Sequence, residues 1–318
     1  MHVTPYSDQD AARWDELVAR APMATFLHTR RFLAYHRDRF ADRSLLVRDD
    51  RDDVVGVFPA ALDPSDAQRV ISHPGITFGG VLHTGDLAGD TMIETLACVK
   101  EHYRERSISA LRYKAIPYTY QQRPANDDLY ALFRMQAVRT RCDLSCTIDL
   151  ANRGERSSRR KRSFAKAVKA GVEVMDGAPY VDELWGVIAG NLERKLGERP
   201  VHTAEEIKHL HALFPDDITF VVGRLDGRTV AGVVLFSSAM VARTQYIASD
   251  ATGYDVSALD AVLEHTIVLA REGGRRYFDF GTSNRSDGQH LSASLYQFKL
   301  DFGGGGVVHE YYDLELSA

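Results

Sequence analysis

The second half of the chain contains an order of predicted elements that few folds can accommodate. Residues 219–225 and 229–237 have the composition of strands and are joined across Asp226 and Gly227, a dipeptide typical of a tight β-hairpin. After the hairpin we predict a strand, a long helix that ends at paired glycines, a strand, a helix and a final strand, over 243–249, 256–272, 276–281, 291–302 and 307–316. This order predicts an α/β fold of the α+β kind, with a mixed, mostly antiparallel sheet flanked by helices.

The first half repeats this order of elements without residue-level identity. Its predicted helices are 8–20, 29–39, 91–104 and 127–136, and its predicted strands are 44–48, 54–62, 69–72, 110–113 and 141–150. Three helices and a short strand precede the hairpin of the second half, over 156–170, 181–196, 203–213 and 172–175. Near residues 151–156 an apolar strand gives way to basic sequence, so we expect two domains, 1–152 and 153–318.

Composition excludes several classes of protein. The chain has 318 residues and a net charge of -5, which argues against a protein that coats duplex DNA. Its first ten residues are polar and acidic, and no stretch reaches the ~20 apolar residues of a membrane span. The three cysteines do not join histidines at zinc spacing. We therefore expect a cytoplasmic protein with no metal and no membrane or DNA partner.

The second half resembles the GNAT acyltransferase core in its order of elements. In that family the helix after the central strand directs its amides at the pyrophosphate of coenzyme A. The matching loop here is SDATGYDVSA at 249–258, with two aspartates, one glycine and no arginine. Carboxylates at this place would repel a pyrophosphate, so coenzyme A binding in the usual mode is not expected.

The whole chain resembles the Fem-like aminoacyltransferases and their relatives encoded with polysaccharide and natural-product genes. The segments that carry the resemblance are FLHTRRF at 26–32, SHPGITFGG at 72–80, YKAIP at 113–117, QYIAS at 245–249, YFDFGTS at 277–283 and FKLDFG at 298–303. The resemblance implies tandem GNAT-like domains, with residues 1–152 on the acceptor side and 153–318 on the donor side, and the acceptor near the interdomain cleft. The coiled-coil arm of the peptidoglycan Fem enzymes is missing, which favours a smaller cytoplasmic acceptor from polysaccharide or antibiotic biosynthesis.

Two residues are candidates for catalysis. Lys299 shares a helix face with Tyr296 and Phe302, and the lysine of the corresponding pair in the Fem-like family is thought to stabilise an oxyanion. Spacing alone would make it an ordinary surface lysine, and the resemblance favours the catalytic role. Asp279 lies between two aromatic residues in a predicted central strand, so it is either a general base with a raised pKa or a carboxylate bound to backbone amides or an arginine.

Further polar residues are candidates for binding the substrate or the donor. They lie at the ends of predicted strands or before helices, where ligands tend to bind, although a structural role is at least as common for each. In the second half they are Gln245, Tyr246, Ser249, Thr282, Ser283, Asn284, Tyr296 and His202, and in the first half His73 and Lys114.

A basic helix is predicted over 156–170. It carries Arg159, Arg160, Lys161, Arg162 and Lys166. Such a stripe suits a phosphate backbone, and for an enzyme that uses aminoacyl-tRNA it would contact the acceptor stem. A solvated face that offsets acidic residues elsewhere is the alternative.

Three functions follow. The first is amide-forming transfer of an aminoacyl group from aminoacyl-tRNA to an amine of a small acceptor, with no bound cofactor. The second keeps the fold but uses a coenzyme A or carrier-protein thioester to N-acylate an amino sugar or natural-product intermediate. The third is a non-catalytic protein that binds RNA or a partner through the basic helix.

Overall fold

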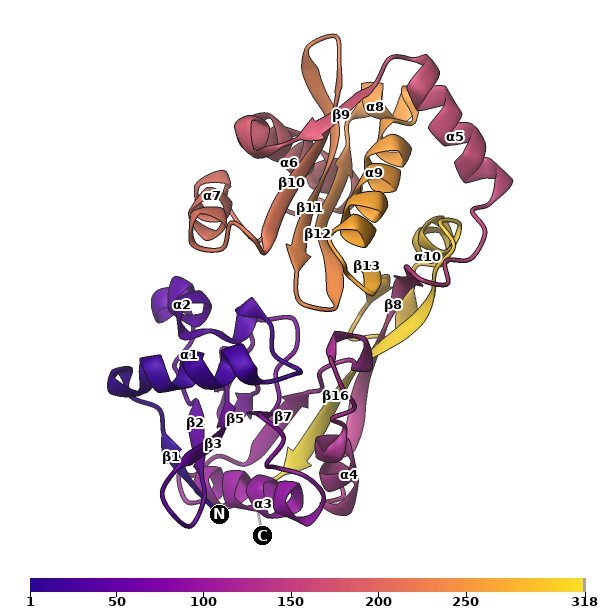
Figure 1. Cartoon of the computed structure of the whole chain (residues 1–318). Helices are drawn as coiled ribbons and strands as arrows, with labels where there is room; N and C mark the ends of the chain where they lie inside the picture. Colours follow the sequence, from indigo (N-terminus) through magenta and orange to yellow (C-terminus); the bar gives the residue numbers. More distant parts are fainter. Residues whose placement is uncertain (317–318) are drawn as a thin grey trace. The chain divides into compact units, whose positions relative to one another are not determined.

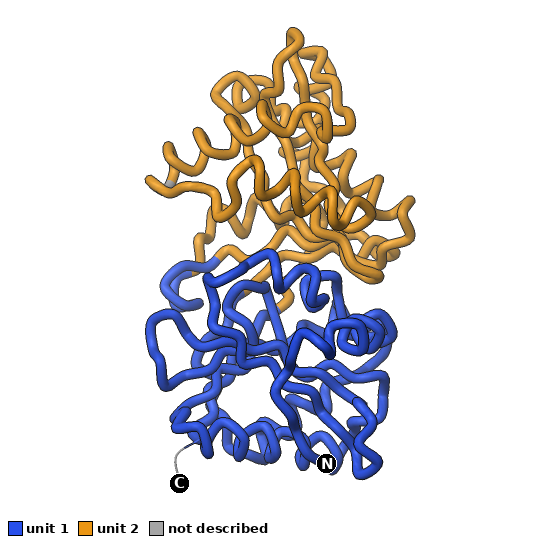
Figure 2. Tube along the Cα trace, turned by 90° about the vertical axis from the view of Figure 1, so that its left-hand side faces the viewer, with its two compact units in different colours: residues 1–143, 284–290, 308–318 blue, residues 144–283, 291–307 orange. Residues whose placement is uncertain are grey.

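The computed structural model describes residues 1–316, which divide into two compact units (Figures 1 and 2). Unit 1 comprises Met1–Asp143, Asn284–His290 and Val308 onward, and unit 2 comprises Leu144–Ser283 and Leu291–Val307. The division falls inside the long strand β8 (Val138–Asp149) and near the start of β16 (Gly305–Glu315), so both strands contribute residues to both units.

The described part of unit 1 contains a four-stranded sheet, one part of a ten-stranded sheet and four α-helices. The helices are α1 (Ala11–Arg20), α2 (Arg30–Leu33), α3 (Asp90–Arg104) and α4 (Asp127–Arg134). The first sheet has the antiparallel order β1-β2-β3-β6, from His2–Pro5, Leu45–Arg48, Val54–Phe58 and Leu82–His83. The second has the order β4-β5-β7-β16, in which Ala61–Asp63, Asp66–Ile71 and Ala110–Lys114 precede β16. Only β5 and β7 among these run parallel.

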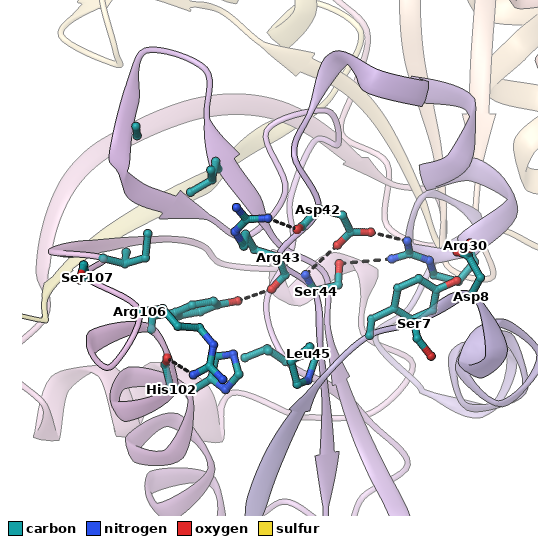
Figure 3. Close-up of a pocket in the computed structure, with 16 residues that line it drawn as sticks. Ser7, Asp8, Arg30, Asp42, Arg43, Ser44, Leu45, His102, Arg106 and Ser107 are labelled. Atoms are coloured by element: carbon teal, nitrogen blue, oxygen red, sulfur yellow. Dashed lines mark hydrogen bonds and ion pairs between the residues drawn. The ribbon is translucent and has the colours of Figure 1, made fainter.

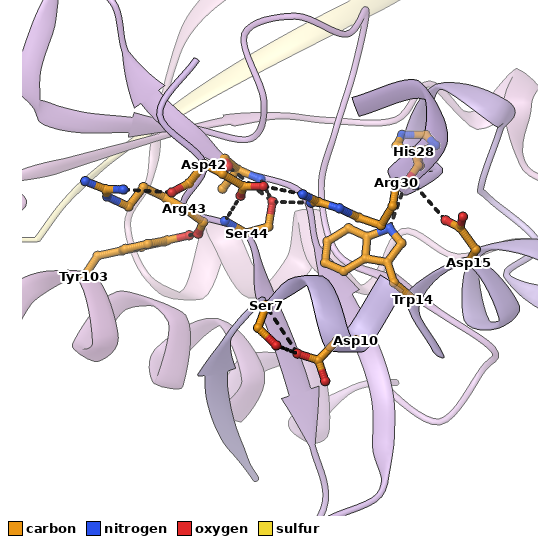
Figure 4. A network of polar contacts seen from close by, with 11 residues as sticks. Ser7, Asp10, Trp14, Asp15, His28, Arg30, Asp42, Arg43, Ser44 and Tyr103 are labelled. Carbon is orange, nitrogen blue, oxygen red and sulfur yellow. Dashed lines mark hydrogen bonds and ion pairs between the residues drawn. The ribbon is translucent and has the colours of Figure 1, made fainter. Parts of the chain in front are cut away.

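A partly buried polar network fixes the first helices of unit 1 (Figure 4). The Trp14 indole of α1 donates to the carbonyl of His28 at 2.8 Å. The backbone N–H of Arg30 donates to Asp15 at 2.7 Å, and its guanidinium pairs with Asp42. Burial lowers the pKa of His28 to about 4, so its ring is neutral at physiological pH. These bonds satisfy polar groups that would otherwise be costly to bury.

Unit 2 is one sheet with helices on both faces (Figure 1). Its strand order is β8-β13-β12-β11-β10-β9, with β9 at Glu173–Asp176, β10 at Ile218–Leu225, β11 at Arg228–Ser237, β12 at Val241–Ser249 and β13 at Tyr277–Thr282. Its helices are α5 (Ser158–Lys169), α6 (Val181–Leu196), α7 (Ala204–Leu213), α8 (Ala251–Val256), α9 (Ala258–Glu272) and α10 (Ala293–Leu300). A small pair, β14 (Asn284–Arg285) and β15 (His290–Leu291), precedes α10, and its residues up to His290 belong to unit 1.

Close glycine contacts show how the helices cover the sheet of unit 2. A Cβ at Gly232 of β11 would lie 2.4 Å from Leu184 of α6, and one at Gly223 of β10 would lie 2.8 Å from Val262 of α9. Gly232 pairs with Val222, the neighbour of Gly223. Because successive strand residues point to opposite faces, α6 and α9 cover opposite faces of the sheet. The strands are buried on both sides, which explains their nearly continuous apolar sequences.

The predicted fold class is confirmed, and several predicted boundaries differ from the structure. The sheets are mixed, mostly antiparallel and flanked by helices. The helix predicted over 256–272 is α9, which begins at Ala258 because Ser257 adopts a left-handed conformation with φ 59°, and the loop predicted over 249–258 contains the short helix α8. The helix predicted over 29–39 is interrupted at Arg37, with φ 48°. The short strands β1 and β6 were not predicted.

The division into units also differs from the expected boundary after residue 152. The last strand, β16, pairs with β7 with Tyr311 opposite Lys114, so its residues from 308 onward belong to unit 1. Residues 144–152 belong to unit 2, because the second half of β8 pairs with β13. The change in composition near residue 152 could not reveal that the last strand of the chain pairs with a strand of the first unit.

Candidate active site

The candidate site lies in unit 2, where two parallel strands cease to pair. Strands β12 and β13 pair at Val241 with Tyr277, Ala242 with Phe278 and Arg243 with Asp279, and their register ends there. Each strand continues beyond this point, to Ser249 and Thr282 respectively. Backbone groups between separated strands are available to other partners, and charged and hydroxyl side chains gather around them.

Lys299 is the central charged group of this region. It extends from α10 and is only 4% exposed. Its Nζ donates to the carbonyls of Gly281 and Thr282, each at 2.8 Å. Gly281 has φ 72°, a conformation that favours glycine and turns the carbonyls at the end of β13 toward the ammonium. Burial lowers the pKa of Lys299 to about 8, which leaves the group mostly protonated at neutral pH.

Asp279 is bonded on several sides and 1% exposed. Its Oδ1 accepts hydrogen bonds from the Ser145 hydroxyl, from the Gly281 amide at 2.8 Å and from the Thr147 hydroxyl at 3.4 Å. Its Oδ2 lies 3.7 Å from Nε of Arg243. Of the two roles considered from the sequence, this geometry favours the bound carboxylate over the general base. Asp279 positions the turn at Gly281 that supplies a carbonyl to Lys299.

Sequence reasoning missed the polar residues around Asp279. Ser145 and Thr147 alternate with apolar residues along β8, and this period of two could have shown that they share a face. Arg243 lies beside Asp279 across the β12–β13 pair, a relation that only the parallel register reveals. Cys146 points to the apolar side, where burial raises the pKa of its thiol to about 12 and leaves it unreactive.

Two buried hydroxyl groups near the end of β13 have no hydrogen-bond partner within residues 1–316. They are the Oγ of Ser283, a residue 2% exposed, and Oγ1 of Thr244. Ser283 is one of the predicted donor-binding residues and follows Thr282, whose carbonyl binds Lys299. An unpaired buried hydroxyl costs free energy unless water or a ligand bonds to it, so Ser283 fits the predicted role.

Tyr246 and His202, predicted separately, form one cluster. The Tyr246 hydroxyl lies 2.7 Å from Nδ1 of His202 and accepts from the His202 amide at 3.2 Å. The Trp185 indole donates to the His202 carbonyl at 3.0 Å and packs edge-on against Tyr246. Gln245 lies at a β-bulge, because Val234 pairs with Tyr246 whereas the next residue of β11 pairs with Thr244.

The other predicted binding residues take up different positions. Ser249 is buried and donates to the Val230 carbonyl at 3.3 Å, which is a structural role. Tyr296 is partly buried, with its hydroxyl close to Gly306. Asn284 belongs to unit 1 and donates to the Gly288 carbonyl at 3.1 Å.

His73 and Lys114 also lie in unit 1. Lys114 is buried, and its Nζ donates to the carbonyls of His73 and Ile76. Burial lowers the pKa of His73 to about 3, so its ring is neutral. Unit 1 also has a cavity of about 850 Å³ between Tyr6, Arg30, Arg43 and Tyr103, none of which was predicted as a site residue (Figure 3).

The loop after β12 is closed by a carboxylate. Asp250 is the N-cap of α8, and its Oδ1 accepts from the Gly253 amide at 2.7 Å. Asp260, in the first turn of α9, pairs with Arg160 and does not cap that helix. The Asp250 carboxylate alone therefore occupies a helix start, that of α8, at which an anion would otherwise bind.

The predicted role of Arg160 in RNA binding is wrong. This residue is only 5% exposed, and its guanidinium donates to Asp260 of α9 at 2.7 Å. It also lies 4.8 Å and 5.6 Å from the ring centres of Phe298 and Phe302. The position faces the core because the turn of the helix places it opposite the solvated stripe, which counting basic residues does not reveal.

The other predicted basic residues of α5 are exposed. Arg159, Arg162 and Lys166 make no ion pair within the described part of the chain, whereas Lys161 pairs with Glu155 at 3.5 Å. Three uncompensated cations on one helix leave a local positive surface on a chain of negative net charge.

Comparison with known proteins agrees with this geometry. Residues 151–299 match the model of the acetyltransferase (GNAT) domain. The second half of the chain contains a GNAT domain. No curated protein matches the chain. FemX shares 13% identity with a TM-score of 0.68 over 99% of this chain and 97% of that one.

Two further solved structures share the fold. The C-terminal domain of an Agrobacterium fabrum protein described as a lysylphosphatidylglycerol synthetase is 13% identical, with a TM-score of 0.62 over 96% of this chain and 92% of that one. A tandem GNAT protein from the clavulanic acid pathway is 14% identical, with a TM-score of 0.51 over 100% and 99%. The protein is thus a transferase that contains a GNAT domain at residues 151–299 and shares its fold with FemX. Within residues 1–316, no helix has the length and apolar character of a membrane span, and no acidic, cysteine and histidine group could hold a metal.

Proposed function

We propose that the protein transfers an aminoacyl group from aminoacyl-tRNA to an amine of a small acceptor. The acceptor nitrogen attacks the ester carbonyl of the donor and forms a tetrahedral oxyanion. The bond from this carbon to the ribose oxygen then breaks, the amide remains, and the amine proton passes to the leaving ribose oxygen, which becomes the free 3′-terminal hydroxyl. The reaction needs no oxidant and no bound cofactor.

Lys299 supplies the cation for the oxyanion. Its ammonium is held by the Gly281 and Thr282 carbonyls, which leaves its third N–H for a substrate oxygen. A charge fixed in advance in a water-poor place stabilises a developing oxyanion more than a mobile one does. Asp279 and Arg243 hold the turn from which these carbonyls project.

The capped start of α8 is the observation that carries the choice of donor. The Asp250 carboxylate already bonds the Gly253 amide, so this turn offers negative charge where coenzyme A would place its pyrophosphate. The exposed cations of α5 support an RNA donor, because they could bind its phosphodiester backbone. The Fem-like fold supports the same choice, through the aminoacyltransferases that the chain resembles.

The experiment incubates the protein with mixed charged tRNAs and a panel of amino sugars and small amines. Release of uncharged tRNA that depends on both the enzyme and an amine, and that disappears after RNase treatment of the donor, supports the proposal. Turnover with acyl coenzyme A alone would contradict it and favour the thioester-dependent N-acyltransferase. RNA binding that survives Lys299→Met, with no turnover by either protein, would favour a binding protein without activity.

A further inference from the structure

An exposed tyrosine lies beside two cations near the end of β12. Tyr254 of α8 is 45% exposed. The Lys195 ammonium is 4.9 Å from its ring centre, and the Arg194 guanidinium is 5.4 Å from it. The Tyr254 hydroxyl accepts a hydrogen bond from Lys195 and lies 3.5 Å from the side-chain oxygen of Asn191. We call these three residues, Arg194, Lys195 and Tyr254, the platform.

The platform is anchored and carries net positive charge. Arg194 donates to the Ser249 carbonyl at 3.3 Å and to the Asn191 side chain at 3.2 Å, so the end of α6 is attached to the end of β12. Neither Arg194 nor Lys195 forms an ion pair with a carboxylate anywhere in residues 1–316. An exposed aromatic ring with two unneutralised cations fits an anion that has a flat, apolar part.

A nucleotide has this chemistry. Bases stack on tyrosine and on guanidinium planes, and phosphates bind arginine and lysine side chains. The start of α8 cannot provide the phosphate contact, because Asp250 takes up its amide. Side-chain cations at the platform replace the usual helix-end contact.

The distance along β12 suits the last nucleotide of an RNA donor. Ser249 follows Tyr246 by three residues, or about 10 Å at the strand rise. Tyr246 belongs to the region where the strands separate, and Ser249 is the residue to which Arg194 is bonded. A reactive ester near the point where β12 and β13 separate and a base near Tyr254 would thus both lie beside the last residues of β12.

We propose that the platform binds the 3′-terminal nucleotide of the RNA donor, with the base on the Tyr254 ring and the phosphate on Arg194 and Lys195. This inference rests on the proposed function, since it specifies how the same donor is held. It assigns the single-stranded end to the platform and leaves the exposed face of α5 for the duplex part, and α8 packs against α5.

The test uses two uncharged tRNAs, one ending in CCA and one that lacks the terminal adenosine. Fluorescence anisotropy measures the binding of each to the full chain. We expect the wild type to prefer the CCA end, and Tyr254→Ala to reduce that preference by about 5- to 160-fold, the range for loss of one stacked base. Tyr254→Phe keeps the ring and should keep most of the preference.

Tyr130→Ala is the matched control, because Tyr130 is also exposed and lies 5.9 Å from an arginine, but belongs to unit 1. It should bind both tRNAs as the wild type does. A preference for CCA that Tyr254→Ala leaves intact would overturn the platform while the proposed donor stands. Equal wild-type affinity for both tRNAs would also overturn it. Absence of binding to either tRNA would overturn the proposed donor itself, and the platform with it.

Discussion

Replacing Lys299 with methionine should strongly slow transfer without destabilising the protein. Burial lowers the pKa of this lysine from 10.5 to about 8. At 1.36 kcal/mol per pH unit, holding the charged ammonium in the fold costs about 3 kcal/mol relative to the unfolded chain. Methionine is neutral and similar in length, so it removes this cost. It also leaves the Gly281 and Thr282 carbonyls without this donor, at about 1 kcal/mol each.

The two effects nearly cancel, so the melting temperature of Lys299→Met should stay within a few degrees of the wild type or rise. Its kcat should fall by about 100- to 1,000-fold, the usual loss when one oxyanion donor is removed. Thermal unfolding and single-turnover release of tRNA measure the two quantities on the same preparation. A large fall in melting temperature would show that Lys299 is structural. Activity within threefold of the wild type would refute its role in catalysis.

Three more outcomes follow from buried charges. The kcat/KM of the wild type should be flat near neutral pH and fall tenfold per pH unit above about pH 8, because Lys299 has a lowered pKa and loses its proton there. A pH–rate profile checks this. In Lys299→Arg the decline should move to higher pH. Arg160→Ala should cost about 3–5 kcal/mol in denaturant unfolding at pH 8, because Asp260 is left buried and unpaired. The loss should shrink at pH 5, since burial raises the pKa of Asp260 to about 6 and the folded state takes up the proton below it. Tyr113→Phe should cost about 1–3 kcal/mol, because its hydroxyl donates to Asp128 at 2.6 Å and accepts from the Val81 amide at 2.9 Å; an unchanged unfolding midpoint would contradict this.

Local patterns in the sequence were sufficient for most elements of the sheet in unit 2. The hairpin at Asp226 and Gly227 is present, with Leu225 opposite Arg228. Lys299 was placed on the correct helix, although spacing alone made it a surface lysine. Its burial depends on the left-handed turn at Gly281, which brings two carbonyls to it from a strand 17 residues earlier. No local pattern encodes that contact.

The errors have a common physical cause, because they concern residues whose partners lie far along the chain. Arg160 looked like one cation of a solvated run, and its partner Asp260 is 100 residues away. The role of Asp279 could not be decided from its neighbours in the sequence, because the Ser145 hydroxyl that donates to it lies 134 residues earlier. Charge and polarity can be read from a sequence, whereas satisfaction by a distant partner decides whether such a group is structural or available for chemistry.

The two faces of α5 link the proposed donor surface to the reactive lysine. On the inner face, Arg160 bonds Asp260 of α9 and lies over Phe298, the residue before Lys299 on α10. On the outer face, Arg159, Arg162 and Lys166 are exposed and carry no ion pair in the described part of the chain. A phosphate backbone on the outer face would therefore contact a helix that is fixed to the element holding Lys299. Under the proposed function, changes to outer cations should weaken donor binding and leave the single-turnover rate at saturation unchanged, whereas loss of Arg160 should lower that rate.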